Sequence, residues 1–270
     1  MPLSFHKVVN SLPGTPLADG VYYVRAGDGF DQFVVTAGQI ALAQNGALAG
    51  KRIKSQFRAQ TDCVSSVNDN SFAFTVSGTG AAFSSLATAS DNSVGILRAA
   101  LGTVATNRVS IASPNFSILR CGLGETLYYS SLRVVTLSDA TNTFALRSGF
   151  LDSVTAESTD GLFFRYTNGV NGGKWQAVTR SNNVETAVDT NVTATANVWV
   201  DLEIRVNPAG TSADFLINGA LTNTVTTNIP NQSGRETGYG VYCQRSVGTA
   251  AVNAFDVDFV EAILNFTTNR

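Results

Sequence analysis

The chain has 270 residues, of which 44% are hydrophobic and 14% are charged, with a formal net charge of −2. About a quarter of the residues in an average globular domain are charged, so this chain has unusually few charged residues, and Ser, Thr and Asn must supply much of its polar surface. The only basic cluster is Lys51-Arg52-Ile53-Lys54, which argues against nucleic acid as a partner. No stretch reaches the roughly 18 apolar residues of a membrane-spanning helix, so we expect no membrane insertion. The first residues lack the apolar run of a secretory signal.

The first fifty residues predict a small three-stranded meander. Residues 21–25 and 32–35 have strand composition and flank a turn at Gly27-Asp28-Gly29, and residues 40–43 form a third candidate strand. A meander of this size is marginally stable alone, so we expect it to dock on another chain or on the next domain. His6 is the single histidine, so a Ser-His-Asp triad or a histidine metal centre is not expected.

From residue 51 onward the sequence predicts strands separated by turns. A short helix at 91–104 is disfavoured because Gly95 and Gly102 interrupt it, and Asn218-Gly219 is a strong hairpin signal. The predicted strands are 117–120, 126–137, 143–150, 161–166, 174–179, 198–206, 213–217, 221–226, 238–244 and 252–266. So many strands without helices predict an all-β sandwich or barrel, and we divide the chain into domains 1–50 and 51–270.

Two strands carry patterns that assign their faces. Within 198–206 the even positions are apolar and the odd positions include Trp199, so we expect Trp199 on the exposed face. Near the C-terminus the apolar phase changes, which predicts a β-bulge between Phe259 and Val260. Pro230 is expected to end the strand that follows the hairpin, because proline cannot donate to the ladder.

The cysteines and the Asp-Asn clusters do not predict a metal or a cofactor. Cys63, Cys121 and Cys243 are an odd number without Cys-x-x-Cys spacing, which predicts buried free thiols in a reducing cytoplasm. The clusters at 68–70 and 91–92 could offer oxygen ligands to calcium, but loops of any Asn-rich β protein look similar.

The order of several motifs is characteristic. They are GFLDS (149–153), DGLFFRY (160–166), GGKWQAVTR (172–180), ETAVDT (185–190), VWVDLEIRVNPAG (198–210), ADFLING (213–219), TTNIP (226–230) and FDVDFVEA (255–262). This order resembles concanavalin-A-like lectin and glucanase jelly rolls, and more narrowly those of tailed-bacteriophage structural proteins. The segment YYVRAGDGFDQFVVTAGQIAL (22–42) is similar to short N-terminal modules of phage tail-fibre and other virion-surface proteins.

The resemblance implies an antiparallel jelly-roll sandwich preceded by a small β-meander. It also implies a non-enzymatic virion structural protein, such as a short tail fibre, a tail tip, a head fibre or a decoration protein. Residues 1–50 would then attach it to other virion proteins, and it would be assembled in the bacterial cytoplasm and displayed on the virion surface. Because phage appendages of this type are commonly trimeric, a homotrimer is expected.

An acidic triplet offers an enzymatic alternative. Asp256, Asp258 and Glu261 resemble the E-x-D-x-x-E pattern of glucanases with this fold, and the predicted bulge would bring Glu261 onto the face of the other two. The pattern begins with Asp rather than Glu and lies in the last strand, where phage relatives show a polar outer face. A solvated or interface-facing strand is therefore the favoured interpretation, and a glycan-degrading enzyme is the less favoured one.

Three aromatic residues are candidates for binding a bacterial surface glycan, because sugars stack on exposed rings. They are Trp199, Trp175 and Tyr166. Trp199 is the strongest candidate because its neighbours on the same face are charged, whereas burial is favoured for Trp175. A subunit interface would use the same Trp and Arg residues, so that interpretation stays open.

Overall fold

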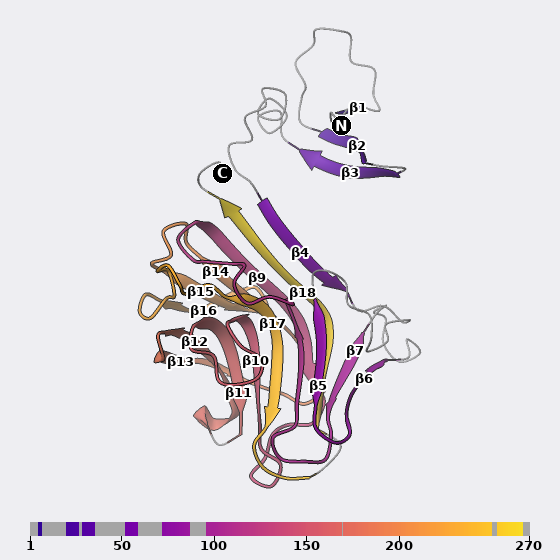
Figure 1. Ribbon diagram of the computed structural model, residues 1–270, viewed down its shortest axis with the longest axis vertical. Coiled ribbons are helices and arrows are strands. Elements are labelled where there is room, and N and C mark those ends of the chain that lie inside the picture. Colours follow the sequence, from indigo (N-terminus) through magenta and orange to yellow (C-terminus); the bar gives the residue numbers. More distant parts are fainter. Residues whose placement is uncertain are drawn as a thin grey trace. The chain divides into compact units, whose positions relative to one another are not determined.

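The computed structural model describes the side chains of residues 72–86, 96–168, 170–249 and 253–266, and the backbone alone of strands within 5–6, 20–26, 29–35 and 52–58. Figure 1 shows the ribbon, in which the chain divides into two compact units. One unit contains Met1–Lys51 with Thr268–Arg270, and the other contains Arg52–Thr267.

The first unit contains a three-stranded antiparallel sheet in the order β1-β2-β3. Its strands are β1 (Phe5–His6), β2 (Gly20–Ala26) and β3 (Gly29–Val35). The strands predicted at 21–25 and 32–35 are present, and β1 was not predicted. The strand predicted at 40–43 lies outside the described residues.

The second unit is a sandwich of two antiparallel sheets, which confirms the all-β prediction (Figure 1). The seven-stranded sheet has the order β13-β12-β11-β10-β17-β8-β5. Its strands are β5 (Ala73–Ser77), β8 (Arg108–Ala112), β10 (Phe144–Leu151), β11 (Gly161–Thr167), β12 (Lys174–Ser181), β13 (Val184–Thr193) and β17 (Gly238–Arg245).

The eight-stranded sheet has the order β16-β15-β14-β9-β18-β7-β6, with β4 (Arg52–Arg58) also paired to β18. Its other strands are β6 (Ala81–Ser85), β7 (Leu97–Leu101), β9 (Gly124–Val134), β14 (Trp199–Val206), β15 (Ala213–Ile217), β16 (Ala220–Val225) and β18 (Ala254–Phe266). In the part of the chain that the structure describes, the only helical turn is the 3-10 turn Asn171–Gly173.

Alternation along the strands builds the core between the two sheets. Leu202, Ile204 and Val206 of β14 are buried there, as the period of two predicts. The Tyr128 hydroxyl in this core is paired: it lies 2.8 Å from the Ser148 hydroxyl and donates to the Gly240 carbonyl at 3.0 Å. The pairing avoids the free-energy cost of burying polar groups without partners.

The hairpin after β15 is confirmed, but its second strand ends earlier than predicted. Asn218 and Gly219 have φ values of 52° and 77°, as a type I′ turn requires. The strand β16 ends at Val225 rather than at Pro230. The chain turns at Asn228, whose φ of 52° is left-handed, so the turn and not the proline ends the ladder.

The bulge in β18 is also confirmed, but it lies closer to the start of the strand. The register with β9 shifts between Val257 and Phe259, so Asp258 is the extra residue. Val260 then fills the core, and Phe259 pairs with Ser131 on the outer face. The predicted position of the bulge, between Phe259 and Val260, was therefore wrong by about two residues.

Two of the three thiols are described, and both are free and buried. Burial raises the pKa of the Cys121 thiol to about 12 and raises that of Cys243 as well. Cys63 and the Asp-Asn clusters at 68–70 and 91–92 lie outside the described residues. No helix among the described residues is long and apolar enough to cross a membrane.

Candidate functional site

The outer face of the eight-stranded sheet carries an ordered grid of side chains. Pairing of β14 with β9 and of β9 with β18 aligns residues across three strands, and alternate residues of each strand face away from the core. The aligned rows are Trp199–Arg133–Asp256, Asp201–Ser131–Phe259 and Glu203–Tyr129–Glu261.

The first row is an ion-pair network centred on Asp256. This carboxylate is fully buried, and it accepts hydrogen bonds from Arg98 Nε at 2.7 Å, Arg98 Nη2 at 2.9 Å and Arg133 Nε at 2.8 Å. The guanidinium carbon of Arg133 lies 4.9 Å from the centroid of the Trp199 ring, within cation–π range. Asp256 therefore joins β7 to β9 across β18, and Arg133 extends the network to Trp199.

The second and third rows border a hollow of about 400 Å³. We call it the outer groove, and its main lining residues are Tyr129, Ser131, Asp201, Glu203, Gly219 and Phe259. Ser131 is short and lies in the row between Asp201 and Phe259, which leaves space between these longer side chains. Gly219 of the hairpin also lines the groove and has no side chain to fill it.

Tyr129 is held in place by an acidic neighbour. Burial, a hydrogen bond to Glu203 and the negative charge of Glu203 raise the pKa of the Tyr129 phenol to about 12. Glu203 is also paired with Arg205 on the same strand. At neutral pH the Tyr129 phenol is therefore protonated. The groove also presents the exposed Asp201 side chain, the Ser131 hydroxyl and the half-buried ring of Phe259.

The catalytic candidates are partly brought together. Asp256 and Glu261 face the same side of the sheet because one extra residue, Asp258, lies between them at the bulge. Asp258 is half-buried and Glu261 is buried. No group of three or more His, Cys, Asp or Glu side chains suited to a metal ion occurs among the described residues.

Comparison with known proteins identifies the family of the chain. Residues 92–258, more than half of the chain, match the family described as SO2946-like, C-terminal domain. The chain belongs to the SO2946-like family. Comparison with curated proteins gives no match.

Two solved structures support the fold of this SO2946-like chain. The protein of unknown function SO2946 from Shewanella oneidensis MR-1 superposes with a TM-score of 0.63 at 10% identity, covering 81% of this chain and 89% of that one. The endo-1,3-β-glucanase from Streptomyces sioyaensis superposes with a TM-score of 0.53 at 13% identity, covering 80% and 96%. The SO2946-like sandwich is thus a concanavalin-A-like jelly roll, as the sequence motifs implied.

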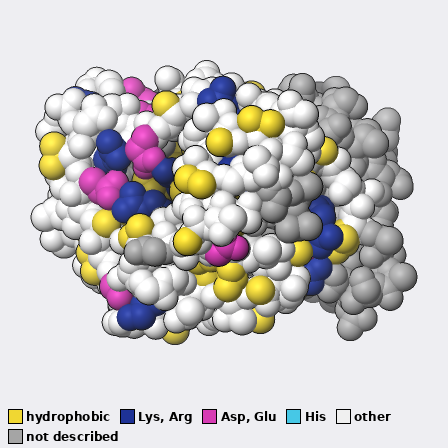
Figure 2. Space-filling model, turned by 90° about the horizontal axis from the view of Figure 1, so that it is seen from below, with side chains coloured by type: hydrophobic (Ala, Val, Ile, Leu, Met, Phe, Trp, Pro, Cys, Tyr) yellow, Lys and Arg dark blue, Asp and Glu magenta, His cyan; other side chains and the backbone are white. Residues whose placement is uncertain are grey.

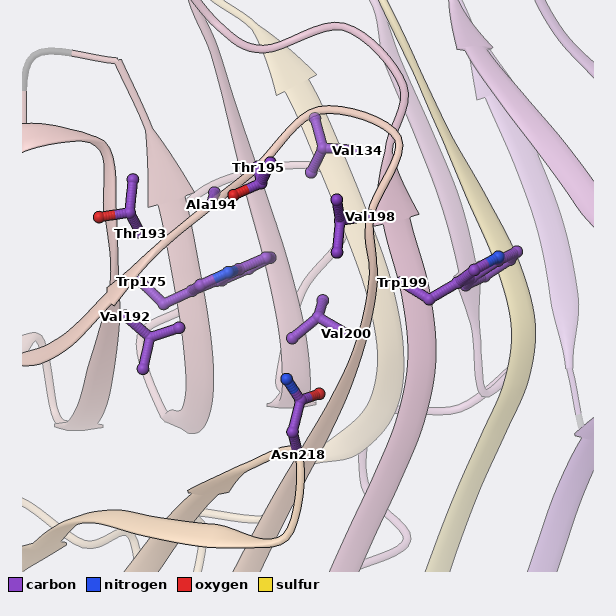
Figure 3. Close-up of a pocket in the computed structure, with 10 residues that line it drawn as sticks. All are labelled: Val134, Trp175, Val192, Thr193, Ala194, Thr195, Val198, Trp199, Val200 and Asn218. Atoms are coloured by element: carbon purple, nitrogen blue, oxygen red, sulfur yellow. The ribbon is translucent and has the colours of Figure 1, made fainter.

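Two of the predicted sugar-binding residues of the SO2946-like chain lie in its core. Trp175 and Tyr166 are each 2% exposed, and their ring centroids are 5.7 Å apart. Trp175 and Trp199 both line a small cavity of about 60 Å³, but the Trp199 ring points away from the other lining residues in Figure 3. Trp175 and Tyr166 cannot stack on a sugar in this conformation, and Trp199 is the candidate that remains.

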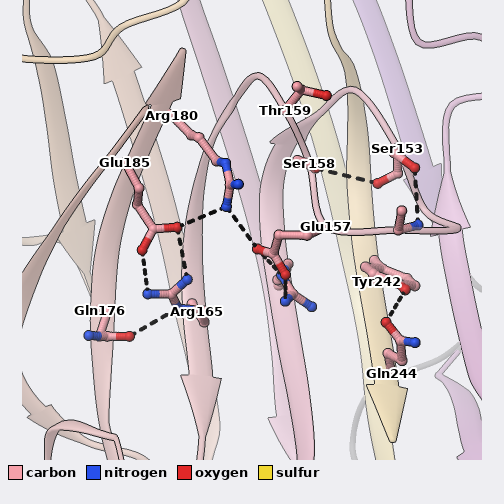
Figure 4. Close-up of polar contacts among 12 residues, drawn as sticks. Ser153, Glu157, Ser158, Thr159, Arg165, Gln176, Arg180, Glu185, Tyr242 and Gln244 are labelled. Carbon is pink, nitrogen blue, oxygen red and sulfur yellow. Dashed lines mark hydrogen bonds and ion pairs between the residues drawn. The ribbon is translucent and has the colours of Figure 1, made fainter. Parts of the chain in front are cut away.

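The opposite outer face, on the seven-stranded sheet, carries a second polar network that sequence reasoning missed. Basic and acidic side chains gather in a mixed cluster on the otherwise sparsely charged surface of Figure 2. Figure 4 shows Glu185 between Arg165 and Arg180, with bonds of 2.8 and 3.3 Å. Burial alone would raise the pKa of Glu185, but the hydrogen bonds and charges of Arg165 and Arg180 outweigh it and lower this pKa.

Proposed function

We propose that this protein is a non-enzymatic binding protein whose jelly roll contacts a surface saccharide through the outer groove. The observation that supports this proposal is the composition of the groove. The rings of Tyr129 and Phe259 can contact the C–H faces of a sugar, and the Asp201 carboxylate and Ser131 hydroxyl can bind sugar hydroxyl groups. Trp199 lies one row away and could extend the contact to a second sugar unit.

The state of Asp256 supports a role without catalysis. Glycoside hydrolysis uses two carboxyl groups that both reach the scissile bond. The Asp256 oxygens are instead occupied by Arg98 and Arg133, and the side chain is fully buried. This carboxylate holds the sheet together and has no access to a substrate.

The saccharide test uses retention of the full chain on immobilised bacterial surface polysaccharides. We expect retention of the wild-type protein and at least a roughly tenfold loss of affinity for Asp201→Asn, because one charge-assisted hydrogen bond contributes about 1.5–3 kcal/mol. Asp214→Asn is the matched control, since Asp214 lies on the neighbouring β15 and bonds Thr224. Equal retention of wild type and Asp201→Asn would contradict the assignment of the groove.

The setting that we propose for this binding protein is the surface of a tailed-phage virion. The resemblance of the motifs to phage structural proteins supports it, and so does the division into a small N-terminal unit and a large sandwich. In this proposal residues 1–50 dock on other virion proteins after synthesis in the bacterial cytoplasm. Mass spectrometry of purified virions should detect the protein, and its absence from particles would contradict this setting.

A homotrimer is part of the proposal. The low charge of the surface reduces the repulsion between copies that pack side by side. Light scattering of the full chain should therefore give three times the 28.4 kDa chain mass. A mass of 28.4 kDa over a range of concentrations would show that any symmetry comes from the particle and not from this chain.

A further inference from the structure

The loop between β10 and β11, residues 152–160, lies against the outer face of the seven-stranded sheet. Val154 packs on a hydrophobic cluster of Leu151, Phe163, Val178 and Tyr242, which is separate from the main core. Arg108 of β8 donates a hydrogen bond to the Thr155 carbonyl at 2.7 Å, so the loop reaches beyond the two strands that it connects. The loop therefore covers an apolar and aromatic patch of the sheet.

The loop is also held by a carboxylate between two arginines. Glu157 pairs with both Nε and Nη2 of Arg147, with an Nε–Oε1 distance of 3.1 Å, and its Oε1 lies 3.7 Å from Arg180 Nη1. The side chains of Arg147 and Arg180 are only 8% and 17% exposed, whereas Glu157 is 37% exposed. The arginines thus belong to the sheet, and the carboxylate reaches them from a more exposed loop (Figure 4).

Glu157 does not satisfy all the donors of these arginines. Arg147 Nη1 and Arg180 Nε are buried and have no hydrogen-bond partner within the described part of the chain. Buried donors without partners are rare in proteins and cost free energy. A ligand with a carboxylate and further acceptor oxygens beside it could pair with more of these N–H groups than Glu157 does.

We propose that Arg147 and Arg180 form a binding site for the carboxylate of an acidic saccharide, and that Glu157 occupies this site until the loop lifts. Paired N–H groups of a guanidinium match the two oxygens of a carboxylate, as the contact between Arg147 and Glu157 illustrates. In a uronic acid the ring oxygen and a hydroxyl lie beside the carboxylate and can meet the remaining donors. Lifting of the loop would also expose Tyr242, whose ring can contact the sugar.

This site is independent of the outer groove, because the two lie on different sheets. Glu157 acts as a competitor, so the apparent affinity of the wild-type site is reduced by the fraction of molecules in which the loop is closed. Removal of the Glu157 carboxylate should therefore reveal the full affinity. A role of Glu157 limited to stability predicts no such gain.

The test measures binding of glucuronate to the full chain by NMR titration. With 1–10% of molecules open, Glu157→Gln should bind glucuronate roughly 10- to 100-fold more tightly than the wild type. Glu157→Gln combined with Arg147→Gln should lose this binding, and neutral glucose should not bind at this site. Glu125→Gln is the control, because Glu125 is an exposed carboxylate on the other sheet.

Stability measurements keep the test decisive if Glu157→Gln weakens the fold. Glucuronate should then raise the melting temperature of Glu157→Gln more than that of the wild type, since a ligand stabilises the state that it binds. Equal affinities in the wild type and Glu157→Gln, or binding that persists without Arg147, would overturn the proposal. Asp201→Asn, which weakens saccharide binding in the outer groove, should leave glucuronate binding to Arg147 and Arg180 unchanged. The proposal for the outer groove and the proposal for the arginine site can therefore be refuted independently.

Discussion

Asp256→Ala should lower the free energy of unfolding of the sandwich by about 3 kcal/mol, because it leaves two arginines without the carboxylate that they share. We use the lower end of the usual range for a broken buried ion pair, since Arg98 is 32% exposed and water can solvate it. For a domain of this size, the loss corresponds to a decrease of roughly 6–12 °C in melting temperature. Thermal unfolding of the full chain at pH 7, followed by circular dichroism, measures it.

The matched control for this prediction is Asp201→Asn. Asp201 is exposed in the row next to Asp256, so the substitution should change the free energy of unfolding by less than about 0.5 kcal/mol. Asp256→Ala should therefore lose stability, whereas Asp201→Asn should keep its stability and lose saccharide binding. A change of 1 kcal/mol in the free energy of unfolding shifts the melting temperature by roughly 2–4 °C in a domain of this size. If Asp256→Ala melts within about 1 °C of the control, the ion pairs contribute little to the stability of the sandwich.

Ser131→Phe should abolish saccharide retention by filling the outer groove. The new ring would occupy part of the 400 Å³ hollow between Tyr129, Asp201 and Phe259, where the sugar is proposed to lie. We expect a loss of affinity greater than about 30-fold, equivalent to roughly 2 kcal/mol or more, as for a central contact of an interface. Because Ser131 faces away from the core, the melting temperature should stay close to that of the wild type.

Ser131→Ala separates the loss of space from the loss of the hydroxyl. Alanine keeps the groove open and removes one hydrogen-bonding group, which contributes about 0.5–1.5 kcal/mol, or roughly a 2- to 12-fold change. Retention on the same immobilised polysaccharide should therefore fall in the order wild type, Ser131→Ala, Ser131→Phe. If Ser131→Phe is retained as well as the wild type, the saccharide does not occupy this groove.

Much of the fold follows from local patterns in the sequence. Nine of the ten strands predicted after residue 51 are present, and the exception, 117–120, is reduced to a single bridge between Leu119 and Thr237. After residue 51, six described strands were not predicted, namely β4 to β8 and β13. Most of these are short or rich in Ala, Ser and Thr, such as AAFSS in β6, so their composition resembles that of a loop. Pairing with distant strands, rather than local propensity, fixes them as strands.

The candidate site was predictable only where one strand shows clear alternation. In β14 the alternation placed Trp199, Asp201 and Glu203 on the outer face, and the structure agrees. In β9 the neighbouring residues Tyr128-Tyr129 and Ser130-Ser131 are identical, although successive residues of a strand face opposite sides of the sheet. The sequence pattern therefore cannot tell which Tyr and which Ser face the core. The core network of Tyr128 with Ser148 and the outward position of Tyr129 appear only with the full register.

Long-range contacts explain the remaining differences. The position of Phe259 depends on where the register with β9 shifts, and no residue within β18 specifies that point. Trp175 and Tyr166 are enclosed by the packing of one sheet on the other. Their burial therefore depends on residues that are distant in the sequence.

The most direct test of binding without catalysis measures, in one sample, the retention of the protein on a polysaccharide and the release of reducing ends from it. The full-length wild-type protein is incubated with bacterial surface polysaccharide, and both the bound protein and the newly formed reducing ends are quantified over time. We predict retention that depends on Asp201, with no more reducing ends than in a sample without protein. Release of reducing ends that disappears in Glu261→Gln would contradict this account and would establish the acidic strand as an active site.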